Sequence, residues 1–170
     1  MYKVIKNCLP PNTFWDLYQG VDPHRENWIL NNPAYSGGHL SWGRDTKSLE
    51  TIFYEAATII KYKVMKLLKK DLILARIHCN GQTAGQICDF HDDFTHREAY
   101  TVILFTSANW NSGWSGEFIC LVDGEYKIAP YIPNDAVLID ASWQHSANCP
   151  NNKTDKLRTT VAFSYFVQDK

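Results

Sequence analysis

The feature that most restricts the fold of this chain is a change in hydrophobic period at Leu72. Before it, residues 48–70 carry apolar side chains at spacings of three and four, which predicts one long amphipathic helix. After it, apolar and polar residues alternate in short segments rich in β-branched and aromatic residues. Turn sequences such as Asn80-Gly81 and Asp123-Gly124 separate these segments. The second pattern predicts strands at residues 72–79, 86–94, 99–107, 117–122, 126–129, 136–140, 143–148 and 157–167.

Eight short strands with no helix between them, preceded by helices, indicate a mainly β fold with supporting helices. The expected architecture is a double-sheet jelly roll backed by N-terminal helices. The length of 170 residues predicts a single domain, with helical support and a loop over residues 1–71 and the β core over residues 72–167. We also expect an edge strand at residues 2–5 and a short helix from Asn12 or Thr13 to Tyr18. Residues 21–45 are expected to form either an ordered surface loop or a lid.

The overall charge excludes some classes of partner. The 17 Lys and Arg residues balance 18 Asp and Glu residues, so the chain has no general attraction for nucleic acid or anionic membranes. No apolar run approaches the roughly 20 residues that span a bilayer, and the N-terminus lacks the apolar core of a signal peptide. The five cysteines include no C-x-x-C pair, which favours free thiols in a reducing compartment. We therefore expect a cytoplasmic protein without membrane or nucleic-acid partners.

The first candidate site lies in the sequence Phe90-His91-Asp92-Asp93-Phe94. In an extended segment, His91 and Asp93 project to the same side, so that an imidazole and a carboxylate share one pocket. His145 follows the predicted strand at residues 136–140 and is the candidate for a third ligand. Two imidazoles and one carboxylate are typical of non-haem Fe(II) oxygenases, because three ligands leave three positions open. The competing interpretations are a hydrogen-bonded His–Asp pair and a core histidine.

The strand predicted from Arg158 onward supplies the second candidate site. Alternation places Arg158, Thr160, Ala162 and Ser164 on one face and a mostly apolar set on the other. An arginine beside two hydroxyls suits a carboxylate ligand, because the guanidinium makes two parallel hydrogen bonds and Thr160 adds a hydroxyl donor. A solvent-facing side of a sheet would give the same pattern.

Together these segments resemble the 2-oxoglutarate/Fe(II)-dependent oxygenases of the prolyl-4-hydroxylase-like type. The resemblance covers roughly residues 72–167, and its order and spacing are more specific than any single motif. The matching segments are residues 80–86 (NGQTAGQ), His91-x-Asp93, residues 100–105 (YTVILF), residues 114–118 (WSGEF), Pro133, residues 138–140 (LID), residues 143–145 (WQH) and Arg158-x-Thr160.

The resemblance implies a double-stranded β-helix and a site for iron and a co-substrate. By this resemblance, His91, Asp93 and His145 hold Fe(II), and Arg158 and Thr160 hold 2-oxoglutarate. Dioxygen is the second co-substrate, and ascorbate is an optional reductant.

The sequence also departs from the family pattern. Many members carry a co-substrate-binding tyrosine on the third strand, where this chain has Phe105, so Tyr100 or a residue near Asn80 is expected to replace it. The usual Gly-Gly-Glu is Ser115-Gly116-Glu117 here, and the interval from His145 to Arg158 is somewhat long.

The implied activity is hydroxylation of an unactivated C–H bond with release of succinate and carbon dioxide. On the resemblance alone the substrate is a prolyl residue in a peptide or protein, and the alternative is a free amino acid or another small molecule. A non-catalytic jelly-roll binding module is the alternative of another class. A zinc site built from His78, Cys79, Cys88 and His96 is disfavoured, because these spacings fit no common zinc pattern.

Overall fold

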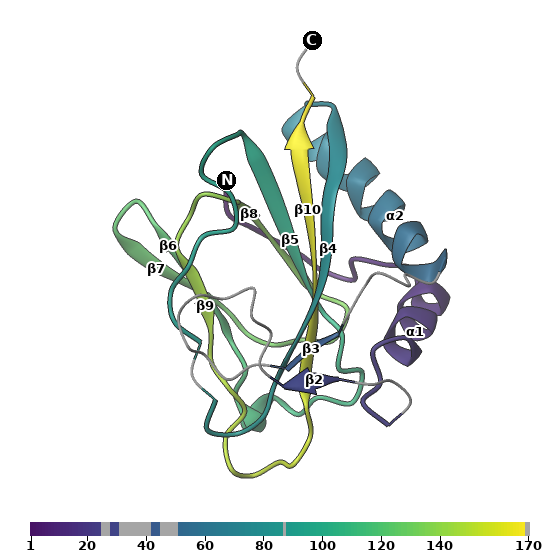
Figure 1. Cartoon of the computed structure of the whole chain (residues 1–170), viewed down its shortest axis with the longest axis vertical. Helices are drawn as coiled ribbons and strands as arrows, with labels where there is room; N and C mark the ends of the chain where they lie inside the picture. The colour runs from purple at the N-terminus through teal and green to yellow at the C-terminus, as the bar shows by residue number, and fades with distance from the viewer. Residues whose placement is uncertain (25–27, 31–41, 45–50, 87, 169–170) are drawn as a thin grey trace.

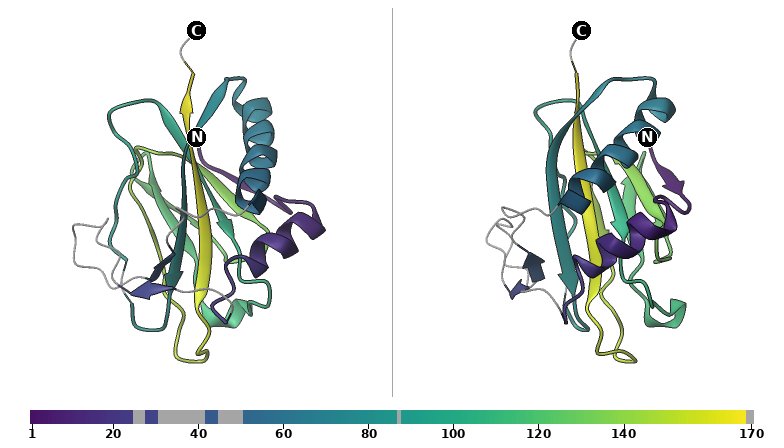
Figure 2. Two further views of the ribbon diagram at one scale, coloured as in Figure 1. Left: turned by 45° about the vertical axis from the view of Figure 1, so that its right-hand side comes forward. Right: turned by 90° about the vertical axis from the view of Figure 1, so that its right-hand side faces the viewer.

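The computed structural model describes residues 1–24, 28–30, 42–44, 51–86 and 88–168. Two sheets face each other, and two helices cover the outer side of the larger sheet (Figures 1 and 2). The elements in chain order are β1 (Lys3–Ile5), α1 (Pro11–Gln19), β2 (Ile29–Leu30), β3 (Trp42–Arg44), α2 (Thr51–Leu68), β4 (Leu72–Gln82), β5 (Ala99–Phe105), the 3-10 helix η1 (Ser112–Trp114), β6 (Phe118–Val122), β7 (Glu125–Ala129), β8 (Ala136–Asp140), β9 (His145–Ala147) and β10 (Arg158–Val167).

The larger sheet has seven strands in the order β1-β8-β5-β10-β4-β3-β2. Strand β10 lies at its centre and pairs antiparallel with β4 and β5. Its side chains alternate as predicted from the sequence: Val161, Phe163 and Tyr165 join the core beneath the helices. Strand β1 forms the predicted edge strand and pairs with β8.

Helices α1 and α2 pack on this outer side because each has one apolar stripe. The buried residues of α2 are Phe53, Ala56, Ala57, Ile60 and Val64; all of them except Ala57 lie on the predicted stripe. The Tyr165 hydroxyl donates to the Ala57 carbonyl at 2.8 Å and ties β10 to α2. Helix α1 begins at Pro11, just before the expected start at Asn12 or Thr13, since a proline is well suited to the first helical position. The predicted positions 48–50 of the long helix lie outside the described residues.

The smaller sheet has the order β7-β6-β9 and faces the inner side of the larger one. A second core fills the space between them, with Ile103, Phe105 and Ile139 from the large sheet and Phe118 and Cys120 from β6. The two sheets share no strand among the described residues, so they form a double-sheet jelly roll whose edges do not close. The predicted fold class is confirmed.

Two segments differ from the sequence-based expectation. Residues 86–94 do not form a strand in their described part; His91 makes only an isolated bridge with His145. Three aspartates in this segment disfavour a regular strand, which explains the difference. Residues 21–45, expected to be a loop, contribute β2 and β3, which extend the sheet beyond β4. Much of that loop prediction falls outside the described residues.

None of the helices in the described ranges is long and apolar enough to cross a membrane. All five cysteines are free thiols, as expected. With no disulfide among them, the stability of the fold rests on core packing and hydrogen bonds.

His78 on β4 gives the fold a dependence on pH. It pairs with Ala162 on the inner face of the sheet. Burial, followed by the charge of Arg76, lowers the pKa of His78 to about 4. Because the folded pKa lies below the ordinary value, protonation favours the unfolded chain, and stability is lost as the pH falls from about 6.5 towards 4. This one group accounts for up to about 3 kcal/mol of that loss.

We expect the free energy of unfolding of His78→Gln, whose side chain cannot be protonated in this range, to fall less than that of the parent as the pH is lowered. Urea unfolding at pH 7 and pH 4.5 measures this difference. Equal declines in free energy of unfolding for the parent and the variant would show that His78 is not the group responsible.

Candidate metal and carboxylate site

The two candidate histidines are brought together by backbone hydrogen bonds. The amide N–H of His91 donates to the carbonyl of His145 at 3.0 Å, and that of His145 donates to the carbonyl of His91 at 2.8 Å. The ring centroids are consequently 4.5 Å apart. His145 comes from β9 and is 5% exposed, with the ring of Phe118 5.5 Å away.

Both imidazoles are held in the tautomer that suits a metal ligand. Nδ1 of His91 lies 3.0 Å from the carbonyl oxygen of Asp89, and Nδ1 of His145 lies 2.9 Å from that of Trp143. A carbonyl oxygen can only accept, so each Nδ1 carries a proton. This is the arrangement in which a backbone partner orients a metal-binding histidine. Burial alone would lower the pKa of His91, but its hydrogen bonds with Cys88 and the Asp89 carbonyl raise it, so a metal ion more often has to displace a proton from this ring than from that of His145.

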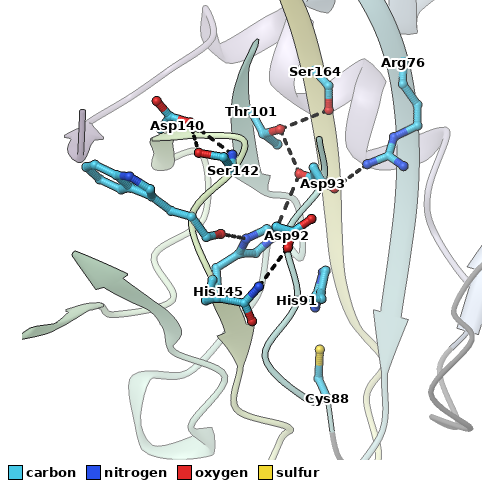
Figure 3. A network of polar contacts seen from close by, with 12 residues as sticks. Arg76, Cys88, His91, Asp92, Asp93, Thr101, Asp140, Ser142, His145 and Ser164 are labelled. Atoms are coloured by element: carbon cyan, nitrogen blue, oxygen red, sulfur yellow. Dashed lines mark hydrogen bonds and ion pairs between the residues drawn. The ribbon is translucent and has the colours of Figure 1, made fainter. Parts of the chain in front are cut away.

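Asp93 lies beside His145, with one carboxylate oxygen, Oδ2, 3.9 Å from the imidazole Nε2 (Figure 3). Thr101 of β5 donates its hydroxyl to the same oxygen at 2.8 Å. The other oxygen, Oδ1, forms an ion pair with Arg76 of β4. Ser164 of β10 contacts the Thr101 hydroxyl at 3.1 Å, so three strands of the large sheet fix the carboxylate.

The charges of these groups are set by burial and by each other. Burial lowers the pKa of His145, which therefore stays uncharged at neutral pH. Burial alone would raise the pKa of Asp93, but the neighbouring His145 and Arg76 and the Thr101 hydroxyl hold it below its usual value. His145 is uncharged at neutral pH, whereas the guanidinium of Arg76, which is paired with Asp93, keeps its positive charge. At neutral pH the site thus combines a carboxylate with a neutral buried imidazole, the protonation states that metal binding requires.

The donor types fit Fe(II), but the side chains are spaced more widely than the ligands of a bound ion. Among the described residues, no three His, Cys, Asp or Glu side chains form a ready metal-binding group. Cis ligands with bonds of about 2.1 Å lie about 3 Å apart, whereas Asp93 and His145 are separated by 3.9 Å. Binding an ion therefore requires the carboxylate and imidazoles to close by a small side-chain movement.

Arg158, at the start of β10, is 2% exposed. Its Nε donates to the carbonyl of Gly116 at 2.8 Å, its Nη1 donates to the side-chain oxygen of Gln82 at 3.1 Å, and its guanidinium lies 4.9 Å from the ring centre of Tyr131. Within the described residues it has no ion pair with a carboxylate. A buried cation without an anion is costly, so this arrangement favours an anionic ligand.

Thr160 lies on the same inner face as Arg158 and is buried beside Phe105. Tyr100 does not share this position. It precedes Thr101 on β5, so its side chain points to the helix side, and its hydroxyl donates to Glu98 at 3.0 Å. The expectation that Tyr100 contributes to a co-substrate site is therefore wrong, because strand alternation directs it away from the inner face that carries Arg158 and Thr160.

Three residues of the site were not identified from the sequence. Arg76 and Thr101 hold Asp93, and Tyr131 lies under Arg158 with its hydroxyl hydrogen-bonded to the Ser107 amide at 2.8 Å. Arg76 is brought to the inner face by its register with Ser164, across two strands that are 88 positions apart in the chain. The alternation of polar and apolar residues along each strand does not reveal which strands pair or in which register.

We expect Arg76 to act as a positioning residue for Asp93. Arg76→Gln should weaken metal binding about tenfold, since partners that orient a ligand are typically worth 10–100-fold in affinity. Arg76→Lys should restore part of the affinity. The visible absorption of bound Co(II) reports both the affinity and the ligand geometry. If Arg76→Gln leaves both the Co(II) spectrum and the Co(II) affinity unchanged, Arg76 does not position Asp93 for metal binding.

Comparison with solved structures places this fold among known ones. HygX from Streptomyces hygroscopicus, determined with nickel, 2-oxoglutarate and hygromycin B bound, is 11% identical with a TM-score of 0.72, covering 97% of this chain and 82% of HygX. A prolyl-4-hydroxylase from Pseudomonas putida is 12% identical with a TM-score of 0.64, covering 98% and 92%. The α-ketoglutarate-dependent epimerase SnoN from nogalamycin biosynthesis is 15% identical with a TM-score of 0.71, covering 97% and 76%.

These similarities show that the chain shares the jelly-roll fold of 2-oxoglutarate/Fe(II) oxygenase structures. No protein-family pattern matches the sequence, and no curated protein matches it.

Proposed function

We propose that this protein is a 2-oxoglutarate- and Fe(II)-dependent dioxygenase. The observation that carries the proposal is the pairing, within one fold, of two carbonyl-oriented imidazoles beside Asp93 with a buried Arg158 that has no carboxylate partner among the described residues. Solved structures of the same fold contain nickel or iron together with 2-oxoglutarate. Neither a purely structural histidine cluster nor a surface-facing arginine accounts for both features.

Each residue has a defined task in this proposal. When bound, Fe(II) and 2-oxoglutarate supply the oxidation of a substrate C–H bond by dioxygen, with succinate and carbon dioxide as products. His91 and His145 donate Nε2 lone pairs, and Asp93 offers the anionic oxygen that Thr101 also contacts. Arg158 binds the far carboxylate of the co-substrate, with Thr160 as an additional hydroxyl donor.

The aromatic rings of the inner face would also limit access of water to a bound metal. Phe118 packs beside His145, and Tyr131 with Phe105 covers the region next to Arg158, with their ring centres 4.8 Å apart. A dry pocket strengthens the interaction between Arg158 and a carboxylate, because the local dielectric constant is low.

For the substrate, we propose a prolyl residue in a peptide or protein. The prolyl-4-hydroxylase from Pseudomonas putida, which matches over 98% of this chain and 92% of its own length, supports this choice. A small-molecule substrate is the second candidate, and the similarity to HygX with hygromycin B bound and to the epimerase SnoN supports it. A cytoplasmic location fits the five free thiols.

Succinate release distinguishes these possibilities. The purified protein is given Fe(II), 2-oxoglutarate, dioxygen and one compound at a time from a panel of proline-containing peptides, free amino acids, nucleotides and glycosides. Peptide-dependent succinate, with one oxygen gained on proline, supports the first candidate. Stimulation by small molecules alone supports the second. Absence of succinate with every compound, and of 2-oxoglutarate binding, favours the non-catalytic binding module.

A further inference from the structure

We propose that Ser115 is a positioning residue for Arg158, and that it acts through the backbone of the turn it shares with Gly116. This role rests on the proposed function, because the group it positions is the one that would bind 2-oxoglutarate. The turn follows η1 and precedes β6. Its Gly116 carbonyl accepts from the Nε of Arg158 at 2.8 Å. Since a guanidinium is planar and rigid, a displaced carbonyl would tilt the whole fork away from a carboxylate ligand.

Arg158 and Trp110 both pack against Gly116, where a side chain would be too close. A Cβ atom at this position would lie 3.2 Å from the Cδ and Nε atoms of Arg158 and 3.3 Å from the Cζ2 atom of Trp110. The indole N–H of Trp110 also donates to the preceding carbonyl, that of Ser115, at 2.8 Å. Two consecutive carbonyls thus accept from two different side chains. The backbone angles of Ser115 and Gly116 therefore set the position of both acceptors.

The backbone of Ser115 has a conformation that is almost restricted to glycine. Its φ is 66° and its ψ is −154°, a region that a residue with a Cβ atom rarely adopts. The next residue, Gly116, has a φ of 101°, which costs a glycine little. The usual Gly-Gly-Glu of the family pattern would allow both positive values without a penalty. Serine in place of the first glycine therefore needs an interaction that offsets the penalty.

The side chain of Ser115 supplies that interaction. Its hydroxyl donates to the Oε2 atom of Glu117 at 2.7 Å, and the side-chain amide of Asn148 donates to the same oxygen at 3.0 Å. The backbone N–H of Asn148 donates to the Glu117 carbonyl at 2.9 Å. Burial alone would raise the pKa of Glu117, but the hydrogen bonds from Asn148 and Ser115 hold it below its usual value. The acceptor is thus ionised at neutral pH, which makes the bond from Ser115 a strong one.

Two substitutions of Ser115 separate the effect of the backbone from that of the hydroxyl, and neither changes a charge. Ser115→Ala keeps the Cβ atom but loses the bond to Glu117, so the turn is expected to relax and move the Gly116 carbonyl. Ser115→Gly also loses the bond, but a glycine tolerates the positive φ and keeps the turn. Opposite results for these two variants are therefore the signature of a residue that acts through the backbone.

Calorimetric titration of 2-oxoglutarate into the Fe(II)-loaded full chain, without dioxygen, tests the proposal. We expect Ser115→Ala to raise the Kd about tenfold, the usual effect of losing one hydrogen bond to a charged group. Ser115→Gly should stay within about threefold of the parent. In the Arg158→Gln background, Ser115→Ala should cause no further loss, because the group that it positions is gone. Ser112→Ala is the matched control, since Ser112 is an exposed serine in η1.

The positioning role is overturned if folded Ser115→Ala keeps the parent's Kd, if Ser115→Gly loses as much affinity as Ser115→Ala, or if the loss persists in the Arg158→Gln background. Should Ser115→Ala fail to fold, Asn148→Ala frees the Glu117 carboxylate with Ser115 in place and should raise the Kd about threefold; an unchanged Kd there would overturn the role as well. A parent protein that binds no 2-oxoglutarate would overturn the proposed function itself, a result distinct from each of these.

Discussion

Asp93→Ala is expected to abolish stable Fe(II) binding and with it all 2-oxoglutarate turnover. Asp93 is the anionic member of the candidate ligand set, and its carboxylate lies 3.9 Å from His145. Loss of a group that only orients a ligand costs about 10–100-fold in metal affinity, and loss of the ligand itself costs more. We therefore expect the affinity to fall by more than about 100-fold.

Equilibrium dialysis with Fe(II) under anaerobic conditions measures this change, and circular dichroism checks that the variant is folded. Asp92→Ala is the matched control. Asp92 is the adjacent acidic residue, but it is exposed and accepts a hydrogen bond from Gln144 at 2.9 Å. The Asp92→Ala variant should retain the parent's affinity for Fe(II). Parent-like Fe(II) binding by Asp93→Ala would remove Asp93 from the ligand set.

Arg158→Gln is expected to weaken 2-oxoglutarate binding about 100-fold while leaving Fe(II) binding intact. The guanidinium is buried and positioned by the Gly116 carbonyl and Gln82, so it is already oriented for a carboxylate. Removal of one partner from a buried, hydrogen-bonded charge pair costs about 3 kcal/mol, which corresponds to about 100-fold in Kd. Arg158→Lys keeps the charge but loses the planar fork, so it should recover only part of the affinity.

Calorimetric titration of 2-oxoglutarate into the metal-loaded variants, without dioxygen, provides the measurement. Arg97→Gln serves as the control, because Arg97 lies at the surface, where it donates to the Val167 carbonyl at 3.0 Å. Unchanged metal affinity in Arg158→Gln shows that the fold has survived. A parent-like Kd for 2-oxoglutarate in that variant would mean that another group binds the carboxylate.

The parts of the fold that follow a local period were predictable from the sequence. Alternation along β10 separated Arg158 and Thr160 from the apolar face, and the structure has the same division. The stripe of residues 48–70 predicted α2 in its described part. Both patterns are visible because one face of each element is buried and the other is not.

The parts that depend on long-range register were not predictable. Arg76 reaches Asp93 because β4 pairs with β10, and Thr101 reaches it from β5. The strand predicted at residues 86–94 is wrong for its described part: its three aspartates disfavour a regular strand, and His91 pairs with His145 only through an isolated bridge. Tyr100 was expected to bind the co-substrate because Phe105 occupies the position of the usual tyrosine in the family pattern. Strand alternation instead turns Tyr100 to the helix side of the sheet.

The most direct test of the proposed iron and 2-oxoglutarate site is an anaerobic titration of 2-oxoglutarate into the Fe(II)-loaded protein, followed by visible absorption. A 2-oxoglutarate chelate on a ferrous centre gives a weak charge-transfer band. We predict that this band appears in the parent, is lost in Asp93→Ala, and requires a much higher 2-oxoglutarate concentration in Arg158→Gln. A folded parent protein that shows no band at saturating Fe(II) and 2-oxoglutarate would contradict the proposed site.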